Sequence, residues 1–242
     1  MAEHPKLFIF INELRKSFRN LLVSFVLCSF GIFFLSPRLL QVVQGHLADK
    51  LYFFAVAEPF LAHVKLAFFA ALFLLMPYLT IQLWRALGKP FNVSRGQLFF
   101  FIFFTCLLFY GGTIFCYLVT LPFGIEFLLG FGSEELKPVI SVSRFVNFIT
   151  IFILAFGLIF ELPIFMVFSV KVGALKRNFY EKNRRYALLF IAFVAALLTP
   201  TPDIVNMMLM GGPLYLLYES GIIILRVLRI GKTEPEPETK TP

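Results

Sequence analysis

The sequence has few of the side chains on which enzymes and soluble domains depend. Of its 242 residues only 15% are charged, and it contains 3 His, 3 Cys and 1 Trp. It is instead rich in apolar side chains, with 59% hydrophobic residues, 34 Phe and a mean hydropathy of +0.85. A soluble domain of this length has no interior large enough to bury so much apolar surface. We therefore predict an all-α, polytopic membrane protein.

The usual sequence signatures of catalysis and cofactor binding are also missing. The chain has no His-Glu-x-x-His pair, no Gly-x-Ser-x-Gly turn and no Gly-rich phosphate-binding loop. Cys28, Cys106 and Cys116 fall within apolar runs, so we expect no external disulfide framework. We predict that the protein is not an enzyme and that it needs neither a cofactor nor a metal.

Six apolar runs predict six transmembrane helices, since about 20 helical residues cross the hydrocarbon core. The runs cover residues 20–37, 60–84, 97–121, 142–170, 187–199 and 204–225. Segments on the side of the two termini hold 17 of the 22 Lys and Arg residues, whereas those on the opposite side hold 3. Because cytoplasmic loops carry the excess of positive charge, both termini are expected to be cytoplasmic. The pI near 9.5 therefore reflects topology and not nucleic-acid binding.

The domain organisation is simple, apart from an unusually short final hairpin. We expect residues 1–231 to form one six-helix membrane domain and residues 232–242, rich in Glu and Pro, to form a disordered cytoplasmic tail. With the preceding Tyr186, the fifth run extends to Thr199 over 14 residues, about 21 Å of helix against about 30 Å of hydrocarbon. The sixth run follows at once, with Asp203 suited to the positive end of its first turn. Such a hairpin must thin the bilayer or pack against other helices.

Glu161 is the most informative single residue. It lies within the apolar run 142–170, ten positions before Lys171, or about 15 Å along a helix. A charged side chain at that depth costs about 2.5–3.5 kcal/mol on insertion scales, so such residues usually face protein or water and have a function. Pro163 is expected to kink the helix beside it, which would make a polar notch within the membrane. The alternative is a protonated acid hydrogen-bonded to a neighbouring helix.

Other polar side chains at membrane depth are candidates for contacts with partner helices. Glu58 and Lys65 are seven residues apart on one helical face, so they either pair through water or each reach an interface separately. Met207 offers an adaptable packing surface. The candidate intramembrane contacts are Glu58, Lys65, Gln82, Glu161, Asp203, Asn206, Met207 and Glu219.

The ordered series of short motifs along the chain resembles the TatC family, the multi-span core of the twin-arginine protein translocase. Each motif alone is weak, but the resemblance covers nearly the whole chain. The motifs are Glu13-Leu14-Arg15, Glu58-Pro59, Pro77-Tyr78, Gln82-Leu83-Trp84, Leu121-Pro122, Phe160-Glu161-Leu162-Pro163, Arg185-Tyr186, Pro202-Asp203 and Leu217-Tyr218-Glu219. The family's six-span layout with a short final hairpin matches as well.

The resemblance implies a receptor and scaffold in the inner (cytoplasmic) membrane of a prokaryote. TatC-like proteins bind twin-arginine signal peptides at the cytoplasmic face, which points here to Glu13 and Arg15. They recruit TatA- and TatB-type single-span partners in a homo- or hetero-oligomer. They export folded proteins by using the proton-motive force.

The chain departs from the family pattern in its first cytoplasmic loop. Relatives usually carry an acid there that acts with the amino-terminal Glu, whereas residues 85–97 contain none. We expect Glu13 to act alone or with Glu181 from the next cytoplasmic loop. A different function stays open at this point, namely a small secondary transporter or channel with Glu161 as its proton or cation site. Such proteins often contain internal repeats, and this sequence shows no convincing one.

Overall fold

The structure is a computed structural model in which two parts of the chain pack as separate compact units, Met1–Leu158 and Ile159–Pro242. It describes residues 4–45, 51–91, 93–130, 139–198 and 204–228. Asp203 and the tail 232–242 lie outside the described residues, as do the side chains of Glu13, Arg15 and Asn206. A single membrane domain over residues 1–231 remains a prediction. The units are called here the N-terminal and the C-terminal unit.

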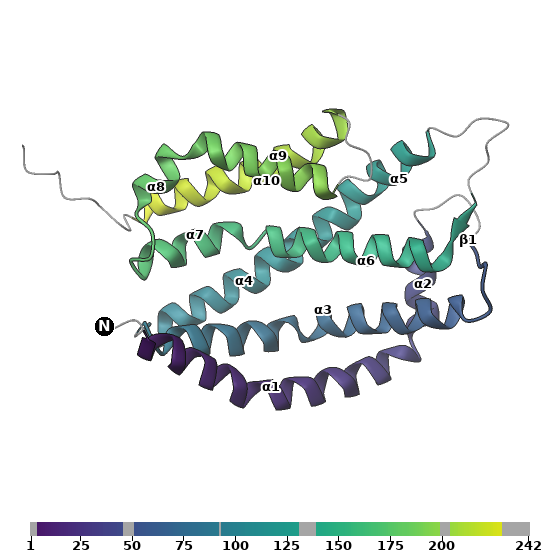
Figure 1. The fold of residues 1–242 in the computed structure, drawn as a ribbon, viewed down its shortest axis with the longest axis horizontal. Coiled ribbons are helices and arrows are strands. Elements are labelled where there is room, and N and C mark those ends of the chain that lie inside the picture. The colour runs from purple at the N-terminus through teal and green to yellow at the C-terminus, as the bar shows by residue number, and fades with distance from the viewer. Residues whose placement is uncertain (1–3, 46–50, 92, 131–138, 199–203, 229–242) are drawn as a thin grey trace, which may run out of the picture. The chain divides into compact units, whose positions relative to one another are not determined.

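The N-terminal unit is built almost entirely of helices. In chain order its elements are α1 (His4–Phe33), α2 (Ser36–Gln44), β1 (Leu51–Tyr52), α3 (Glu58–Gly88), α4 (Arg95–Phe115), the π-helix η1 (Cys116–Thr120), α5 (Leu121–Leu129), β2 (Ile140–Ser141) and α6 (Val142–Ile159). Helices α1 and α3 lie side by side and run in opposite directions (Figure 1). Phe25 of α1 stacks on Phe68 of α3 with ring centroids 5.8 Å apart, which fixes the pair near its middle.

Aromatic side chains and one glycine hold α4 between its neighbours. Trp84 of α3 lies flat on Phe101 of α4, with ring centroids 4.6 Å apart, and its Nε1 donates to Thr105 Oγ1 at 3.0 Å. On α6, a Cβ placed at Gly157 would lie 2.7 Å from the ring of Phe109, which is fully buried. The two helices therefore approach each other so closely that only glycine fits at this position.

Local chemistry explains where α4 begins and where its continuation widens. Ser94 Oγ accepts from the Gln97 amide at 3.5 Å, and the Gln97 side chain accepts from the Ser94 amide at 3.4 Å, which forms a capping box. Near the other end, Pro122 has no N–H to donate to the preceding turn. The chain passes through η1 just before it, and the Leu121 amide donates to the carbonyl of Cys116 five residues earlier.

A short strand pair, which the sequence did not predict, joins the segment before α3 to the start of α6. β1 and β2 are parallel, with Leu51 opposite Ile140 and Tyr52 opposite Ser141. The all-α prediction is therefore correct for the fold class, with this one exception. Two paired residues per strand are too few to be stable by themselves, so the polar contacts around the pair help to hold the two segments together.

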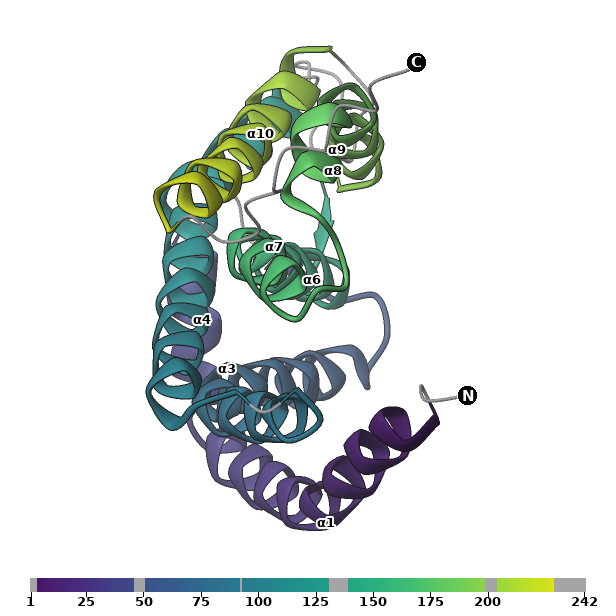
Figure 2. The same ribbon diagram turned by 90° about the vertical axis from the view of Figure 1, so that its left-hand side faces the viewer.

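The C-terminal unit is a helical hairpin packed on a third helix. Its elements are α7 (Leu162–Lys171), α8 (Arg177–Lys182), α9 (Arg184–Leu198) and α10 (Ile204–Val227). Helix α10 lies beside α9 (Figure 2) and packs against α7, where a Cβ at Gly221 would lie 2.7 Å from the sulfur of Met166. Gly173 ends the turn after α7 with φ of 76°, a left-handed conformation that side chains disfavour.

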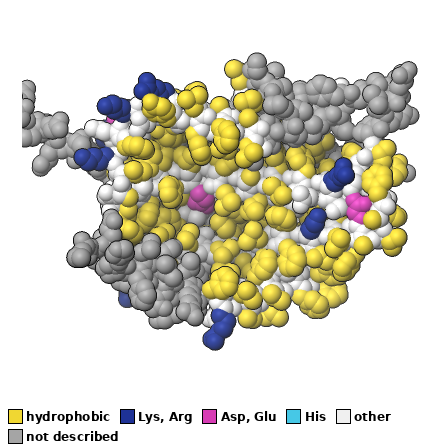
Figure 3. Space-filling model, viewed as in Figure 1, with side chains coloured by type: hydrophobic (Ala, Val, Ile, Leu, Met, Phe, Trp, Pro, Cys, Tyr) yellow, Lys and Arg dark blue, Asp and Glu magenta, His cyan; other side chains and the backbone are white. Residues whose placement is uncertain are grey.

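The length and the surface of the helices fit a membrane. Three stretches among the described residues are long and apolar enough to span it, namely Glu58–Gly88, Arg95–Glu126 and Val142–Lys171. Phe18–Phe33 and Ser36–Gln44, bent by 72°, make a fourth if they form one span. Hydrophobic side chains cover most of the described surface in Figure 3, as expected where lipid is the solvent. The described part of each predicted apolar run lies on one helix or on consecutive helices, whereas the count of six spans remains a prediction.

Candidate functional site

The helix is interrupted at Glu161, as expected from Pro163. Helix α6 ends at Ile159 and α7 begins at Leu162, so that Phe160 and Glu161 form a turn between them. Glu161 is the residue before α7, its carbonyl accepts from the amide of Phe165 at 3.0 Å, and its half-buried side chain does not cap the helix. Pro163 lies in the first turn of α7, where its missing N–H costs no helical bond. A carboxyl group therefore occupies an interruption in the helical backbone within a candidate span.

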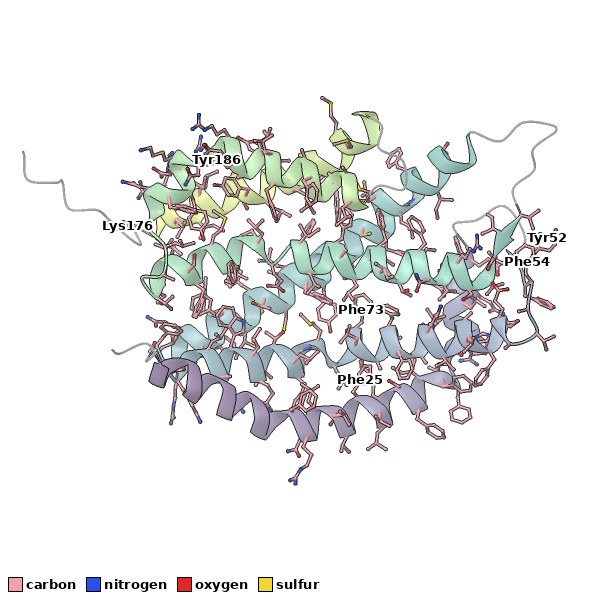
Figure 4. All side chains as sticks on the ribbon, in the orientation of Figure 1. Phe25, Tyr52, Phe54, Phe73, Lys176 and Tyr186 are labelled. Atoms are coloured by element: carbon pink, nitrogen blue, oxygen red, sulfur yellow. The ribbon has the colours of Figure 1, made fainter. Side chains whose placement is uncertain are left out.

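Glu58 and Lys65 both reach the start of α6 and do not pair with each other. Glu58 Oε2 accepts from the amide of Phe54 at 2.7 Å, and its other oxygen accepts from the hydroxyl of Ser141. Lys65 Nζ donates to Ser143 Oγ at 3.3 Å. Figure 4 shows Tyr52 and Phe54 at this end of α3. The shared face was predicted correctly, but the two serines that receive the charged groups were missed, since nothing in their local sequence marks them.

The carboxylate of Glu181 on α8 is held by two arginines. Arg177 Nε lies 3.0 Å and Arg226 Nε 2.9 Å from Glu181 Oε1. The hydrogen bond from Arg226, together with that from Arg177, keeps the pKa of the Glu181 carboxyl below its ordinary value. Glu181 thus ties α8 to α10 through Oε1. A signal-peptide arginine that bound both oxygens of the carboxylate would have to share Oε1 with these two partners or displace one of them.

Glu219 on α10 makes a second ion pair that connects the two helices of the hairpin. Its Oε2 lies 3.2 Å from Arg184 Nη2 at the start of α9, and its Oε1 accepts from the hydroxyl of Tyr215 at 3.0 Å. Tyr218, the residue immediately before Glu219, donates its hydroxyl to the carbonyl of Tyr180 at 2.7 Å. Glu219, which the sequence suggested as an intramembrane contact, therefore joins α9 to α10 within this unit.

The remaining predicted residues within the described part of the chain lie on α1, α3 and α10. Gln82 is half-buried on α3, two residues before the buried Trp84. Met207 is half-buried near the start of α10, and Met208 beside it is 72% exposed. Glu13 lies on α1, on which Arg15 also lies. The exposed Met208 extends the adaptable packing surface that the sequence suggested at Met207.

The N-terminal unit contains an apolar hollow of about 450 Å³ between α2, α3, α6 and the junction of α4 with η1. Three hydroxyl-bearing residues line it, and each hydroxyl donates to a backbone carbonyl: Tyr117 at 3.2 Å, Thr113 at 2.9 Å and Thr150 at 2.6 Å. The other lining side chains are apolar and include Leu39, Phe69, Phe73, Ile149 and Ile153. The hollow therefore suits an aliphatic or aromatic group rather than a polar substrate.

These sites define a class of protein. The chain is an all-helical, multi-span membrane protein in which the acids Glu58, Glu181 and Glu219 join its own elements. Among the described residues, no three His, Cys, Asp or Glu side chains are placed to hold a metal ion.

The comparisons with known proteins name the family. The profile of the family "Sec-independent protein translocase protein (TatC)" matches residues 10–213. The TatC protein of Campylobacter jejuni is 32% identical over 238 residues, 94% of each chain, and that of Carboxydothermus hydrogenoformans is 34% identical over 194 residues, 79% of each. A crystal structure of a twin arginine translocase receptor, TatC, shares the fold with a TM-score of 0.78 at 24% identity, covering 93% of this chain and 100% of that one. The chain belongs to the TatC family of Sec-independent protein translocases.

Family membership decides between the functions that the sequence left open. The protein is a membrane component of twin-arginine protein translocation and not an enzyme. It is also not a small secondary transporter or channel, so Glu161 needs an explanation within protein translocation.

Proposed function

We propose that this chain is the receptor and scaffold subunit of a twin-arginine translocase in the cytoplasmic membrane of a bacterium. Six spans place both termini in the cytoplasm, where the protein binds twin-arginine signal peptides. It assembles TatA- and TatB-type single-span partners and exports folded proteins by using the proton-motive force. The family match over residues 10–213 carries this proposal, and the 17 to 3 bias of Lys and Arg supports the orientation.

Signal recognition rests mainly on Glu13, with Arg15 in the same element. A pair of signal arginines needs a carboxylate, because the segment around Glu13 is otherwise basic. The loop 85–97 supplies no acid, and Glu181 already accepts hydrogen bonds from two arginines. Arginine binds a carboxylate through two parallel charge-assisted bonds, which lysine cannot reproduce. Glu13 is thus the acid that distinguishes Arg-Arg from Lys-Lys signals.

Signal-peptide affinity tests the proposed function directly. A hydrogen bond to a charged group is worth about 1.5–3 kcal/mol, or roughly 10- to 150-fold in affinity. Glu13→Ala should therefore weaken Arg-Arg binding by at least about tenfold and abolish its preference over Lys-Lys. Glu126→Ala, which removes an exposed acid from α5, is the matched control and should change neither value. Arg95→Glu should strengthen Arg-Arg binding by restoring an acid to the first loop. Unchanged affinity in Glu13→Ala would show that signals bind elsewhere or not at all.

Partner assembly is assigned to the hairpin of α9 and α10, on its α10 side. Helix α9 has 15 residues, about 22 Å of helix, so the hairpin leaves polar edges near lipid. Its α10 side offers Met207 and the exposed Met208, and Asp203 and Asn206 precede them in sequence. A single-span partner that packs here would cover the exposed side chains and supply polar contacts that lipid cannot provide.

Glu161 is the proposed intramembrane contact for a partner or a passing protein. Its carboxyl group occupies the interruption between α6 and α7. Backbone irregularity at membrane depth is tolerated where it is buried in protein or lines a water-filled cavity. We therefore assign to Glu161 a hydrogen bond to a polar group of a partner helix during transport.

A further inference from the structure

The segment 171–186, called here the α8 junction, carries more positive charge than its carboxylates neutralise. Glu181 and Glu219 are each paired with arginines of the same unit. Three further cations of the junction are exposed and form no ion pair with a carboxylate among the described residues: Lys176, Lys182 and Arg185. The junction therefore presents net positive charge to whatever lies beside the start of α9.

Of these cations, Arg185 is the one held in a fixed position. Its Cζ lies 4.7 Å from the centroid of the Tyr186 ring, and its Nη2 donates to Tyr186 Oη at 3.0 Å. Tyr186 is itself 55% exposed, at the same end of the unit as Lys176 (Figure 4). The ring fixes the plane of the guanidinium and reduces the entropy that a ligand would have to overcome. The other N–H groups of Arg185 point to no acceptor among the residues that the structure describes, and a planar guanidinium suits a phosphate.

The exposed face of α9 continues from this arginine as an apolar stripe. At helical spacing after Tyr186 come the exposed Leu189 (64%), Phe190 (64%), Phe193 (65%) and Leu197 (74%). The helix spans about 22 Å, whereas the hydrocarbon core is about 30 Å thick. Lipid beside α9 is therefore drawn toward the helix ends, where a cation can hold its headgroup.

We propose that Arg185, positioned by Tyr186, binds the phosphate of an anionic phospholipid whose acyl chains lie along the exposed stripe of α9. A charged headgroup site above an apolar stripe matches an amphipathic lipid. A partner helix would match the stripe alone. The uncompensated charge of the junction favours an anionic lipid over a zwitterionic one. If the orientation proposed above holds, the lipid belongs to the cytoplasmic leaflet, and the site does not depend on signal recognition.

Lipid binding to the full-length protein tests the proposal. The purified chain is titrated with phosphatidylglycerol or phosphatidylcholine, and bound lipids are counted by native mass spectrometry. Arg185→Gln should weaken phosphatidylglycerol binding by about tenfold, the loss of one charge-assisted contact. Lys176→Gln makes the same charge change nearby and should weaken it less than about twofold. The phosphatidylglycerol affinity of Arg185→Lys should lie between those of the two glutamine variants. Tyr186→Leu should lower the preference for phosphatidylglycerol over phosphatidylcholine.

Four results would overturn the proposal. Equal losses of phosphatidylglycerol affinity in Arg185→Gln and Lys176→Gln would mean that the overall charge of the α8 junction attracts the lipid, without a defined site at Arg185. Unchanged binding in Arg185→Gln and Arg185→Lys would exclude Arg185. Displacement of the lipid by excess inorganic phosphate would mean a site for the free anion. A photo-crosslinker at Phe193 that captures only single-span partner protein, and no lipid probe, would assign the stripe to a helix.

Discussion

Adding one methyl group at each of three glycines tests the helix packing of both units. At Gly157 the new Cβ would lie 2.7 Å from the ring of Phe109, which is fully buried. At Gly221 it would lie 2.7 Å from Met166 Sδ, but a thioether side chain has rotatable bonds and can move. At Gly111 nothing lies within 4 Å. The same substitution therefore meets a rigid ring, a flexible side chain or open space.

The expected order of stability follows from two opposing terms. Alanine is better than glycine in a helix by about 1 kcal/mol, and overpacking a well-filled contact costs about 1–3 kcal/mol. Gly157→Ala should thus lose up to about 2 kcal/mol, Gly221→Ala should be near neutral, and Gly111→Ala should gain up to about 1 kcal/mol. Unfolding by SDS in mixed micelles, followed by circular dichroism, measures all three. The fluorescence of the single tryptophan, Trp84, reports on the N-terminal unit alone. If Gly157→Ala were as stable as Gly111→Ala, the close contact of α4 with α6 would be wrong.

Three further predictions concern polar groups and the proposed partner surface. Glu161→Gln should keep export while Glu161→Ala loses it, because the amide still hydrogen-bonds; loss in both would mean that charge is required, and full export by the Ala variant at normal protein level would exclude a role. A cysteine at Met208, 72% exposed, should crosslink to a single-span partner, whereas one at Met210, 3% exposed, should not; labelling of the first by lipid probes only would refute the docking surface. Because the pKa of Glu181 is lowered in the folded protein, its stabilising effect is complete above its unfolded pKa of about 4.3 and is lost as pH falls through the folded value. The α8–α10 connection should therefore loosen only in acid, seen as faster amide exchange in α8, and Glu181→Gln should show the same exchange at neutral pH.

The helices were predictable because their signal is local. Apolar runs and the proline after Glu161 both act within one or two turns of their own position. The two-residue strand pair was not predictable, because it depends on which distant segments meet. Glu161 illustrates both sides: its backbone break followed from Pro163, whereas the partner group proposed for its carboxyl belongs to another chain and leaves no mark on this sequence.

The partners of the polar side chains were the least predictable part of the candidate site. Lys65 and Ser143 are 78 residues apart, Glu58 and Ser141 83 apart, and Glu181 and Arg226 45 apart. Helical periodicity states which residues share a face of one helix, but not which helix lies opposite. The sequence therefore identified acids worth testing and could not tell which of them hold the chain together.

The ion pairs of Glu181 with Arg177 and Arg226 limit how much this carboxylate can add to the affinity for signal peptides. A signal arginine that displaced Arg226 would exchange one guanidinium–carboxylate contact for another of the same kind. The freed Arg226, which is already half exposed in the pair, would return to solvent, so the exchange gains little affinity. Glu13 is the only acid between residues 4 and 45. Glu181→Ala should consequently have a small effect alone and a larger one in the Glu13→Ala background, where the weaker contact is the one that remains. A large loss of Arg-Arg binding in Glu181→Ala alone would mean that signal binding rearranges the ion pairs of α8, and the junction would then be part of the receptor surface.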